Sequence, residues 1–271
     1  MSKKVILITG ASSGIGKATA KKLINEGHIV YGAARRVEKM NDIKGLKTIK
    51  LDVSKEEDCK KAVDTVMNRE GRIDVLFNNA GFGLYGSVED IPLKDARYQF
   101  DVNMFGLAAM TKAVLPHMRK QNSGKIINTS SMGGKIYTPL GAWYHATKHA
   151  LEGFSDCLRL ELKQFNIDVV VIEPGIIQTS FGDVVGGPMM KYSGKGVYSN
   201  MAKRVARTTE NSYKEGGGTS PDVIANKVSK AINARKPKTR YVKGKYASMM
   251  INTRKWFGDK VFDKMIMSTV K

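Results

Sequence analysis

The chain has 271 residues, of which 42% are hydrophobic and 26% charged, with a formal net charge of +20. This composition excludes collagen-like and low-complexity proteins and is typical of a globular domain. The only cysteines, Cys59 and Cys157, show neither paired nor metal-binding spacing, so we expect no disulfide framework and no metal site. The sequence shows no signal peptide and no run of roughly 20 apolar residues, which predicts a cytoplasmic protein.

The positive charge is concentrated near one end of the chain. From Arg235 onward there are 11 Lys and Arg against 2 Asp and Glu. Clustered cations attract anionic polymers and membranes, but the sequence contains no nucleic-acid reading module, so we expect no nucleic-acid partner. Solvated surface charge is the first interpretation of this cluster, and peripheral membrane contact is the alternative.

Short β-branched runs alternate with helical patterns along most of the chain. Strands are predicted at Val5–Ile8, Ile29–Tyr31, Thr48–Leu51, Val75–Phe77, Ile126–Asn128 and Val169–Ile172, with a weaker one at Thr239–Val242. Helices are predicted at Gly16–Glu26, Glu56–Arg69, Leu93–Arg119, Ala142–Phe165 and Pro221–Ala234. This alternation predicts the α/β class, as a doubly wound Rossmann fold whose central parallel β-sheet is flanked by helices.

Local signals refine the boundaries of this single domain. Ser54 and Glu57 predict a capping box, and Ser220 before Pro221 predicts another helix start. Residues 1–244 are expected to form the cofactor-binding domain, in which the glycine-interrupted segment 181–218 forms a mobile helical lid over the substrate. Residues 245–271 predict a basic amphipathic helical tail that packs on the domain.

The segment from Thr9 to Gly16 reads TGASSGIG, between the first strand and the first helix. Glycines there let the backbone approach a pyrophosphate, whose charge the helix amides and the helix dipole stabilise. The segment therefore predicts a dinucleotide site that includes Gly10, Ser12, Ser13, Gly14, Ile15 and Gly16.

Further motifs follow in a fixed order after this loop. They are Leu51-Asp52-Val53, Asn78-Asn79-Ala80-Gly81, Asp101-Val102-Asn103, Ser130-Ser131, Tyr144-His145-Ala146-Thr147-Lys148 and Pro174-Gly175-Ile176-Ile177-Gln178-Thr179. The series resembles the classical short-chain dehydrogenase/reductase family, and looks most like its 17β-hydroxysteroid and retinol dehydrogenase branch. The resemblance implies a nicotinamide cofactor and interconversion of a ketone or aldehyde with an alcohol. It also implies a homodimer or homotetramer formed through the helices Leu93–Arg119 and Ala142–Phe165.

The resemblance also assigns cofactor contacts. It places Asp52 and Val53 beside the adenine and Ile177 and Thr179 beside the nicotinamide. The remaining implied contacts are Asn79, Ala80, Gly81, Pro174 and Gly175, together with Tyr144 and Lys148.

The second strand ends at Ala34, where NAD-using relatives carry an acidic residue that binds ribose hydroxyls. Arg35 and Arg36 follow, and guanidinium groups suit a ribose 2′-phosphate. The missing carboxylate and the added cations predict NADP(H).

Tyr144 and Lys148 are four residues apart in a predicted helix, so their side chains share a face. A free phenol titrates near pH 10, and an adjacent ammonium favours the lowered pKa that acid–base work needs. The resemblance implies that Tyr144 transfers the proton, that Ser131 stabilises the carbonyl oxygen, and that Asn103 supports a water chain to Lys148. Ser130 competes with Ser131, but Ser131 has the 13-residue spacing to Tyr144 that is common in the family.

The predicted pocket walls are mostly apolar, which favours a small hydrophobic carbonyl or alcohol substrate. The expected substrate contacts are Leu84, Met132, Tyr137, Trp143, Phe181 and Met189. Two other functions stay open on the sequence: a non-catalytic NADP-binding regulatory or scaffold protein, and an epimerase or dehydratase built on the same cofactor domain.

Overall fold

The computed structural model describes residues 2–179, 181–213 and 217–270, and for 182–184 the backbone alone. Its described strands form one parallel sheet of order β3-β2-β1-β4-β5-β6-β7. The strands are β1 (Val5–Thr9), β2 (Ile29–Ala34), β3 (Lys47–Lys50), β4 (Val75–Asn78), β5 (Gly124–Thr129), β6 (Ile167–Pro174) and β7 (Arg240–Lys243). The predicted α/β class and doubly wound parallel sheet are confirmed.

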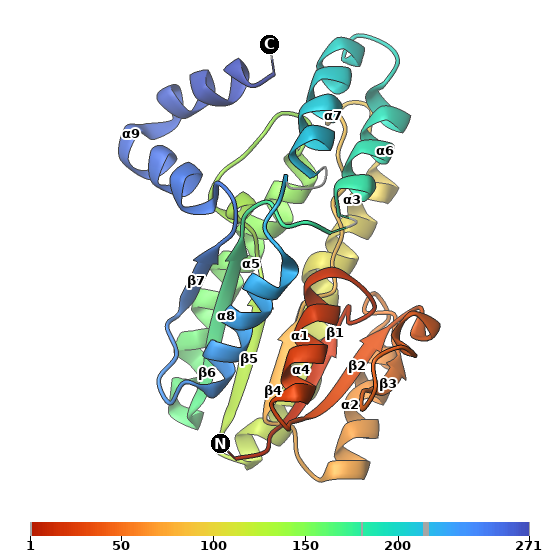
Figure 1. The fold of residues 1–271 in the computed structure, drawn as a ribbon, viewed down its shortest axis with the longest axis vertical. Helices are drawn as coiled ribbons and strands as arrows, with labels where there is room; N and C mark the ends of the chain where they lie inside the picture. The colour runs from red at the N-terminus through yellow and green to blue at the C-terminus, as the bar shows by residue number, and fades with distance from the viewer. Residues whose placement is uncertain (1, 180, 214–216, 271) are drawn as a thin grey trace.

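Two helical layers cover the sheet because its central strands are apolar on both faces. In β1, Leu7 contributes to one core and Ile8 to the other. The helices α1 (Gly14–Asn25) and α8 (Pro221–Asn233) cover one face, and α2 (Glu56–Glu70), α4 (Gly106–Lys120) and α5 (Ala142–Leu162) cover the other (Figure 1). Short 3-10 turns lie at Val37–Met40, Met132–Gly134 and Lys163–Phe165.

The strand order reverses at β1, which pairs with β2 on one side and β4 on the other. In doubly wound sheets, this reversal opens a crevice at the carboxyl ends of the strands. The expected dinucleotide loop and the Asn79 motif both begin at this edge, directly after β1 and β4.

The helix predicted over Leu93–Arg119 is interrupted. It consists of α3 (Leu93–Phe100), a π-helical turn at Asp101–Phe105 and α4. Asn103 lies inside this π turn, where its side chain bonds the backbone of Phe82. A single π turn inside an α-helix often marks a functional site.

Two helices and a kinked tail lie above the carboxyl edge of the sheet (Figure 1). The expected lid is α6 (Phe181–Ser193) followed by α7 (Ser199–Tyr213), while 214–216 lie outside the described residues. The glycines of α6 do not interrupt its helix, because buried Val185 and Met189 anchor it. The tail forms α9 (Ala247–Ser268), and Gly258 (φ 75°, ψ 177°) divides it.

Two helix starts were predicted from local signals, and one of them is wrong. Helix α2 begins at Glu56 after Lys55, and Ser54 instead donates from its backbone N and its Oγ to Asp52 Oδ1. The start of α8 is confirmed, because Ser220 Oγ accepts a hydrogen bond from Asp222 N. No helix among the described residues is long and apolar enough to span a bilayer.

The α8 cap gives a test of the fold's local energetics. Ser220→Ala removes the acceptor for Asp222 N, so the free energy of unfolding should fall by about 1 kcal/mol. Urea unfolding followed by circular dichroism measures this change. Ser248→Ala is the matched control, because Ser248 lies exposed within α9 and alanine favours a helix there. Equal losses in both variants would contradict the assigned cap.

Candidate active site

A cavity of about 520 Å³ opens at the carboxyl edge of the sheet, beyond the ends of the neighbouring strands β1 and β4. Residues from seven separate motifs line it together. The predicted site residues in its walls are Gly10, Ser12, Ser13, Gly14, Ile15, Arg35, Arg36, Asp52, Val53, Asn79, Ala80, Gly81, Ser131, Met132, Tyr144, Lys148, Pro174, Gly175, Ile177, Thr179 and Phe181. The fold therefore brings one elongated site together from positions that are distant in the sequence.

One end of the cavity fits a pyrophosphate. Gly10 has a φ of 67°, and a Cβ on Gly16 would lie 2.3 Å from the carbonyl oxygen of Gly10. This loop therefore requires glycine at both positions. Ser13, the N-cap of α1, makes no side-chain cap bond, which leaves the first amides of the helix for an anionic ligand.

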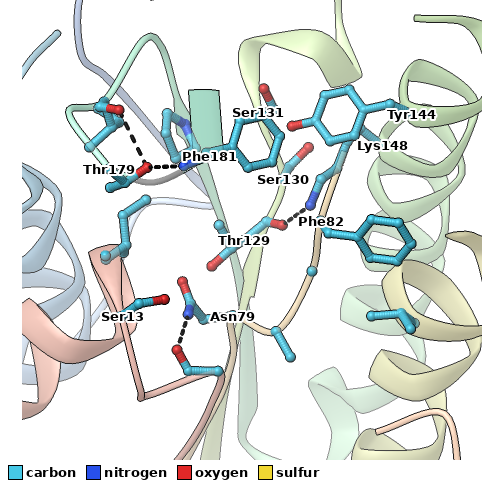
Figure 2. A pocket seen from close by; sticks show the side chains of 18 of the residues that line it. Ser13, Asn79, Phe82, Thr129, Ser130, Ser131, Tyr144, Lys148, Thr179 and Phe181 are labelled. Atoms are coloured by element: carbon cyan, nitrogen blue, oxygen red, sulfur yellow. Dashed lines mark hydrogen bonds between the residues drawn. The ribbon is translucent and has the colours of Figure 1, made fainter. Parts of the chain in front are cut away.

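Thr9 fixes this loop against the end of β4. Its Oγ1 accepts hydrogen bonds from the backbone N of Asn79 and of Ala80, each at 3.0 Å. Asn79 Nδ2 donates back to the carbonyl oxygens of Thr9 and Gly10, each at 3.2 Å. Asn79, a predicted cofactor contact, thus holds the glycine loop through its amide nitrogen and also lines the cavity (Figure 2).

The two arginines lie at the end of the cavity next to β2. Buried Ala34 ends β2, and Arg35 and Arg36 follow it, exposed on the cavity rim. Arg35 Nη1 donates to the hydroxyl of Tyr98, at 2.9 Å, which orients its guanidinium toward α3. Asp52 lies opposite and accepts two hydrogen bonds from Ser54. This part of the cavity suits a phosphorylated ribose beside an adenine.

The other end gathers Tyr144, Ser131 and Lys148 (Figure 2). Tyr144 and Lys148 lie on one face of α5, with Lys148 Nζ 5.9 Å from the centre of the phenol ring. Ser131 lies near enough to lower the pKa of the Tyr144 hydroxyl, and its Oγ accepts a hydrogen bond from Gly133 N. Ser130 also lines the cavity, but its buried hydroxyl has no hydrogen-bond partner among the described residues.

Burial controls the proton affinities here. It raises the pKa of Tyr144 to about 12, although the hydrogen bond with Ser131 lowers it in part. The sequence predicts a lowered pKa for this phenol, whereas in the structure desolvation of the phenolate raises it. Burial also lowers the pKa of Lys148 to about 8, and its ammonium donates to the carbonyl oxygen of Thr129 at 2.8 Å.

A charge network behind Lys148 supports its ammonium form. Glu152, one turn further along α5, is almost fully buried, and its carboxylate raises the pKa of Lys148 against the effect of burial. Lys135 and Arg240 each lie 3.0 Å from Glu152 Oε2. Arg240 also pairs with Glu173, whose pKa burial and the Glu152 carboxylate raise to about 7. The sequence reading missed this network, because its members come from separate elements.

Two neighbouring polar residues have structural roles. Asn103 lies outside the cavity lining, where its side chain accepts from Phe82 N and donates to Phe82 O and Thr147. Buried His145 receives a hydrogen bond from Thr138 N at Nε2, so Nδ1 carries the proton donated to Gly133 O. Burial lowers the pKa of His145 to about 4, which keeps the ring neutral.

Only two of the six predicted substrate contacts line the cavity. Met132 and Phe181 line the cavity, whereas Leu84, Tyr137, Trp143 and Met189 do not. Leu84 and Trp143 pack in a cluster with Ile91, Met189 is fully buried between the lid helices, and Tyr137 packs on Phe262. Tyr85, which lies in a segment that the sequence predicts for the pocket wall, also lines the cavity, together with Phe82 and Tyr213, which were not predicted. Gly16 also lies outside the lining, beneath the Gly10 turn.

Comparisons with known proteins agree with this geometry. The family model described as short chain dehydrogenase matches residues 4–186. A 3-ketodihydrosphingosine reductase of Bacteroides thetaiotaomicron is 44% identical over 183 residues, which are 68% of this chain and 67% of that protein. A short-chain dehydrogenase structure from Streptomyces avermitilis is 33% identical, has a TM-score of 0.83 and matches 93% of each chain. A serine dehydrogenase complexed with NADP+ is 26% identical, with a TM-score of 0.77 over 89% of this chain and 94% of that one.

The chain belongs to the short-chain dehydrogenase family and is an oxidoreductase. Members of this family bind a nicotinamide dinucleotide, and the glycine loop, the free helix amides and the elongated cavity fit such a cofactor.

The buried ammonium of Lys148 gives a pH-dependence that can be measured without substrate. The pKa of Lys148 is about 8 in the folded protein, whereas an exposed lysine, as in the unfolded chain, has a pKa of 10.5. Between these two pH values the unfolded chain therefore binds more protons than the folded one. The wild type should therefore gain stability relative to Lys148→Met as the pH rises from 7 toward 10.5, by up to about 3 kcal/mol. Urea unfolding at a series of pH values measures the difference, with Lys60→Met on α2 as the exposed control. A constant difference between wild type and Lys148→Met would contradict the assigned burial.

Proposed function

We propose that the protein uses NADP(H) to interconvert a hydrophobic ketone or aldehyde with its alcohol. The observation that carries the proposal is the placement of Tyr144, Ser131 and Lys148 together at the apolar end of a cavity that holds Arg35 and Arg36 at its other end. A purely regulatory NADP-binding protein has no need for a buried phenol next to a buried ammonium.

The side chains divide the work on a carbonyl substrate. When bound, the nicotinamide supplies or accepts the hydride at the substrate's carbonyl carbon. Tyr144 donates its proton to the carbonyl oxygen, and the Ser131 hydroxyl stabilises the negative charge that develops there. Lys148 faces the Tyr144 ring, so its ammonium stabilises the phenolate left after proton transfer. Asn103 holds Phe82, and with it the loop after β4, in place beneath the site.

The residues after β2 support NADP(H) over NAD(H). Ala34 offers no carboxylate to the ribose hydroxyls, and the Arg35 guanidinium is oriented by Tyr98 at the rim where a 2′-phosphate would lie. The complex of a serine dehydrogenase with NADP+ shows that a relative with this fold accepts the phosphorylated cofactor.

The walls around Tyr144 support a hydrophobic substrate. Tyr85 and Phe181 each lie with ring centres 5.6 Å from the Tyr144 ring, and Met132 and Ile136 complete an apolar wall. The name of the Bacteroides relative describes a reductase of a ketone on a sphingoid base. We therefore propose a ketone with a long apolar chain, and the 17β-hydroxysteroid or retinol branch stays a prediction from sequence.

Exposed apolar residues on the outer helices support self-association. Leu93, Phe105 and Leu160 are all more than 60% exposed, and they lie on the helical run α3 to α4 and on α5. We propose that these helices form the homodimer, or one contact of a homotetramer, that the sequence leads us to expect.

The assignment of Tyr144 as the general acid predicts the effect of removing its hydroxyl oxygen. Tyr144→Phe should lower kcat at least about 100-fold with NADPH and a panel of aliphatic, aryl, steroid and sphingoid ketones. NADPH affinity, measured by calorimetry, should change little. Tyr198→Phe is the control, because its hydroxyl bonds Glu89 on the surface. Turnover that survives in Tyr144→Phe would refute the mechanism, and NADPH binding without turnover of any ketone by the wild type would favour a regulatory protein.

The cofactor assignment predicts a change in binding that needs no turnover. Arg35→Ser should weaken NADPH binding about 10-fold to 100-fold and leave NADH binding nearly unchanged, because it removes charge-assisted bonds to the 2′-phosphate alone. Calorimetric titration of the two cofactors measures this selectivity. Arg69→Ser, an exposed arginine on α2, is the control. Equal weakening of both cofactors would overturn the 2′-phosphate assignment.

A further inference from the structure

The tail helix α9 carries an unusual concentration of exposed apolar side chains. Six of the thirteen large apolar side chains that are exposed among the described residues lie between Tyr246 and Met267. The two most exposed of these six, Trp256 and Phe257, are 72% and 67% exposed and adjacent, directly before the Gly258 kink. Water-exposed aromatic pairs of this kind mark interaction surfaces more often than scattered single residues do.

These side chains form a stripe that the fold itself does not use. At about 100° per residue, Tyr246, Met249, Trp256 and Phe257 project within an arc of about 100°. Ile251 projects about 120° further round the same helix and packs with Ile136, and Met250, at the edge of the stripe, belongs to the same cluster. The packing of α9 on the domain therefore leaves the aromatic stripe outside.

The acidic and basic side chains of α9 also differ in whether the protein itself binds them. Its two acids are held by the protein, because Tyr137 donates to both Asp259 and Asp263, and Asp259 also pairs with Arg254. Lys255, Lys260 and Lys264 are exposed, and none has an ion-pair partner in the described part of the chain. A partner that approaches the outer face of α9 therefore contacts aromatic rings flanked by lysines that have no ion-pair partner among the described residues.

We propose that the outer face of α9 docks on an anionic lipid bilayer, with Trp256 and Phe257 at the headgroup level and the lysines on lipid phosphates. Trp side chains favour the membrane interface, and each nearby lysine adds electrostatic attraction to anionic lipid. Both signals together give stable peripheral binding, and no helix among the described residues spans a membrane. A second copy of the chain is the weaker occupant, because it brings the same positive charge to this face.

The docked position of α9 also places the candidate active site near the bilayer. On its inner side α9 packs through Phe262 and Ile266 against Met132 and Ile136, which line the cavity. Docking therefore brings this cavity wall close to the lipid surface. This last point rests on the proposed function and suits a substrate that partitions into membranes.

Flotation of the full-length protein with vesicles tests the docking without cofactor or substrate. The wild type should float with vesicles of phosphatidylcholine and phosphatidylglycerol in equal parts, and at least about tenfold less with phosphatidylcholine alone. Trp256→Ser/Phe257→Ser should reduce flotation about tenfold or more, and Lys255→Gln/Lys260→Gln several-fold. The matched controls are Val88→Ser, which removes an exposed apolar side chain elsewhere, and Lys60→Gln/Lys61→Gln, which removes two charges on α2.

The remaining outcomes overturn the proposal. No flotation with the anionic vesicles, or unchanged flotation of Trp256→Ser/Phe257→Ser, would exclude this face as a membrane contact. Sedimentation velocity without lipid tests the alternative occupant, a second copy of the chain. If Trp256→Ser/Phe257→Ser dissociates an oligomer that the wild type forms, the stripe is a contact between copies. Because none of these measurements involves turnover, their failure leaves the proposed oxidoreductase function untouched.

Discussion

The ammonium of Lys148 has to stay charged in a place that water barely reaches. Burial alone favours the neutral amine, and its pKa of about 8 reflects that cost. The structure offsets the cost with the Thr129 carbonyl oxygen and the carboxylate of Glu152. Much of the surrounding architecture follows from this requirement. The last residue of β5 presents the carbonyl, α5 presents both the lysine and the glutamate, and β7 supplies Arg240 to neutralise the glutamate.

The parts of the fold that were predictable are those set by local sequence. Apolar strands such as Val5–Thr9 stand out because both of their faces are buried. The pair Tyr144 and Lys148 was equally accessible, because a spacing of four fixes a helix face. The glycine loop was predictable for a similar reason, since its conformation needs glycine at defined positions.

Contacts that depend on tertiary packing were not predictable in this way. Trp143 precedes Tyr144 by one residue, so its side chain turns about 100° around α5 and packs with Leu84 instead of lining the cavity. The bounds of α6 inside the predicted helical lid could not be predicted, because glycine disfavours a helix and the buried Val185 and Met189 stabilise one against that preference. Tyr213 reaches the cavity only because α7 folds back over it.

Arg240 has a consequence for how the enzyme is made. The glycine loop, Ser131, Tyr144 and Lys148 all precede it in the chain, and so does Glu152, whose buried carboxylate it helps to neutralise. During synthesis, the sheet up to β6 can form while the ribosome still holds the last strand. Until Arg240 emerges and pairs beside β6, the carboxylates of Glu152 and Glu173 have Lys135 nearby but lack the guanidinium that bridges them. A nascent chain that stops before β7 would therefore carry Tyr144 and Lys148 on α5 without the guanidinium that bridges the two carboxylates behind them.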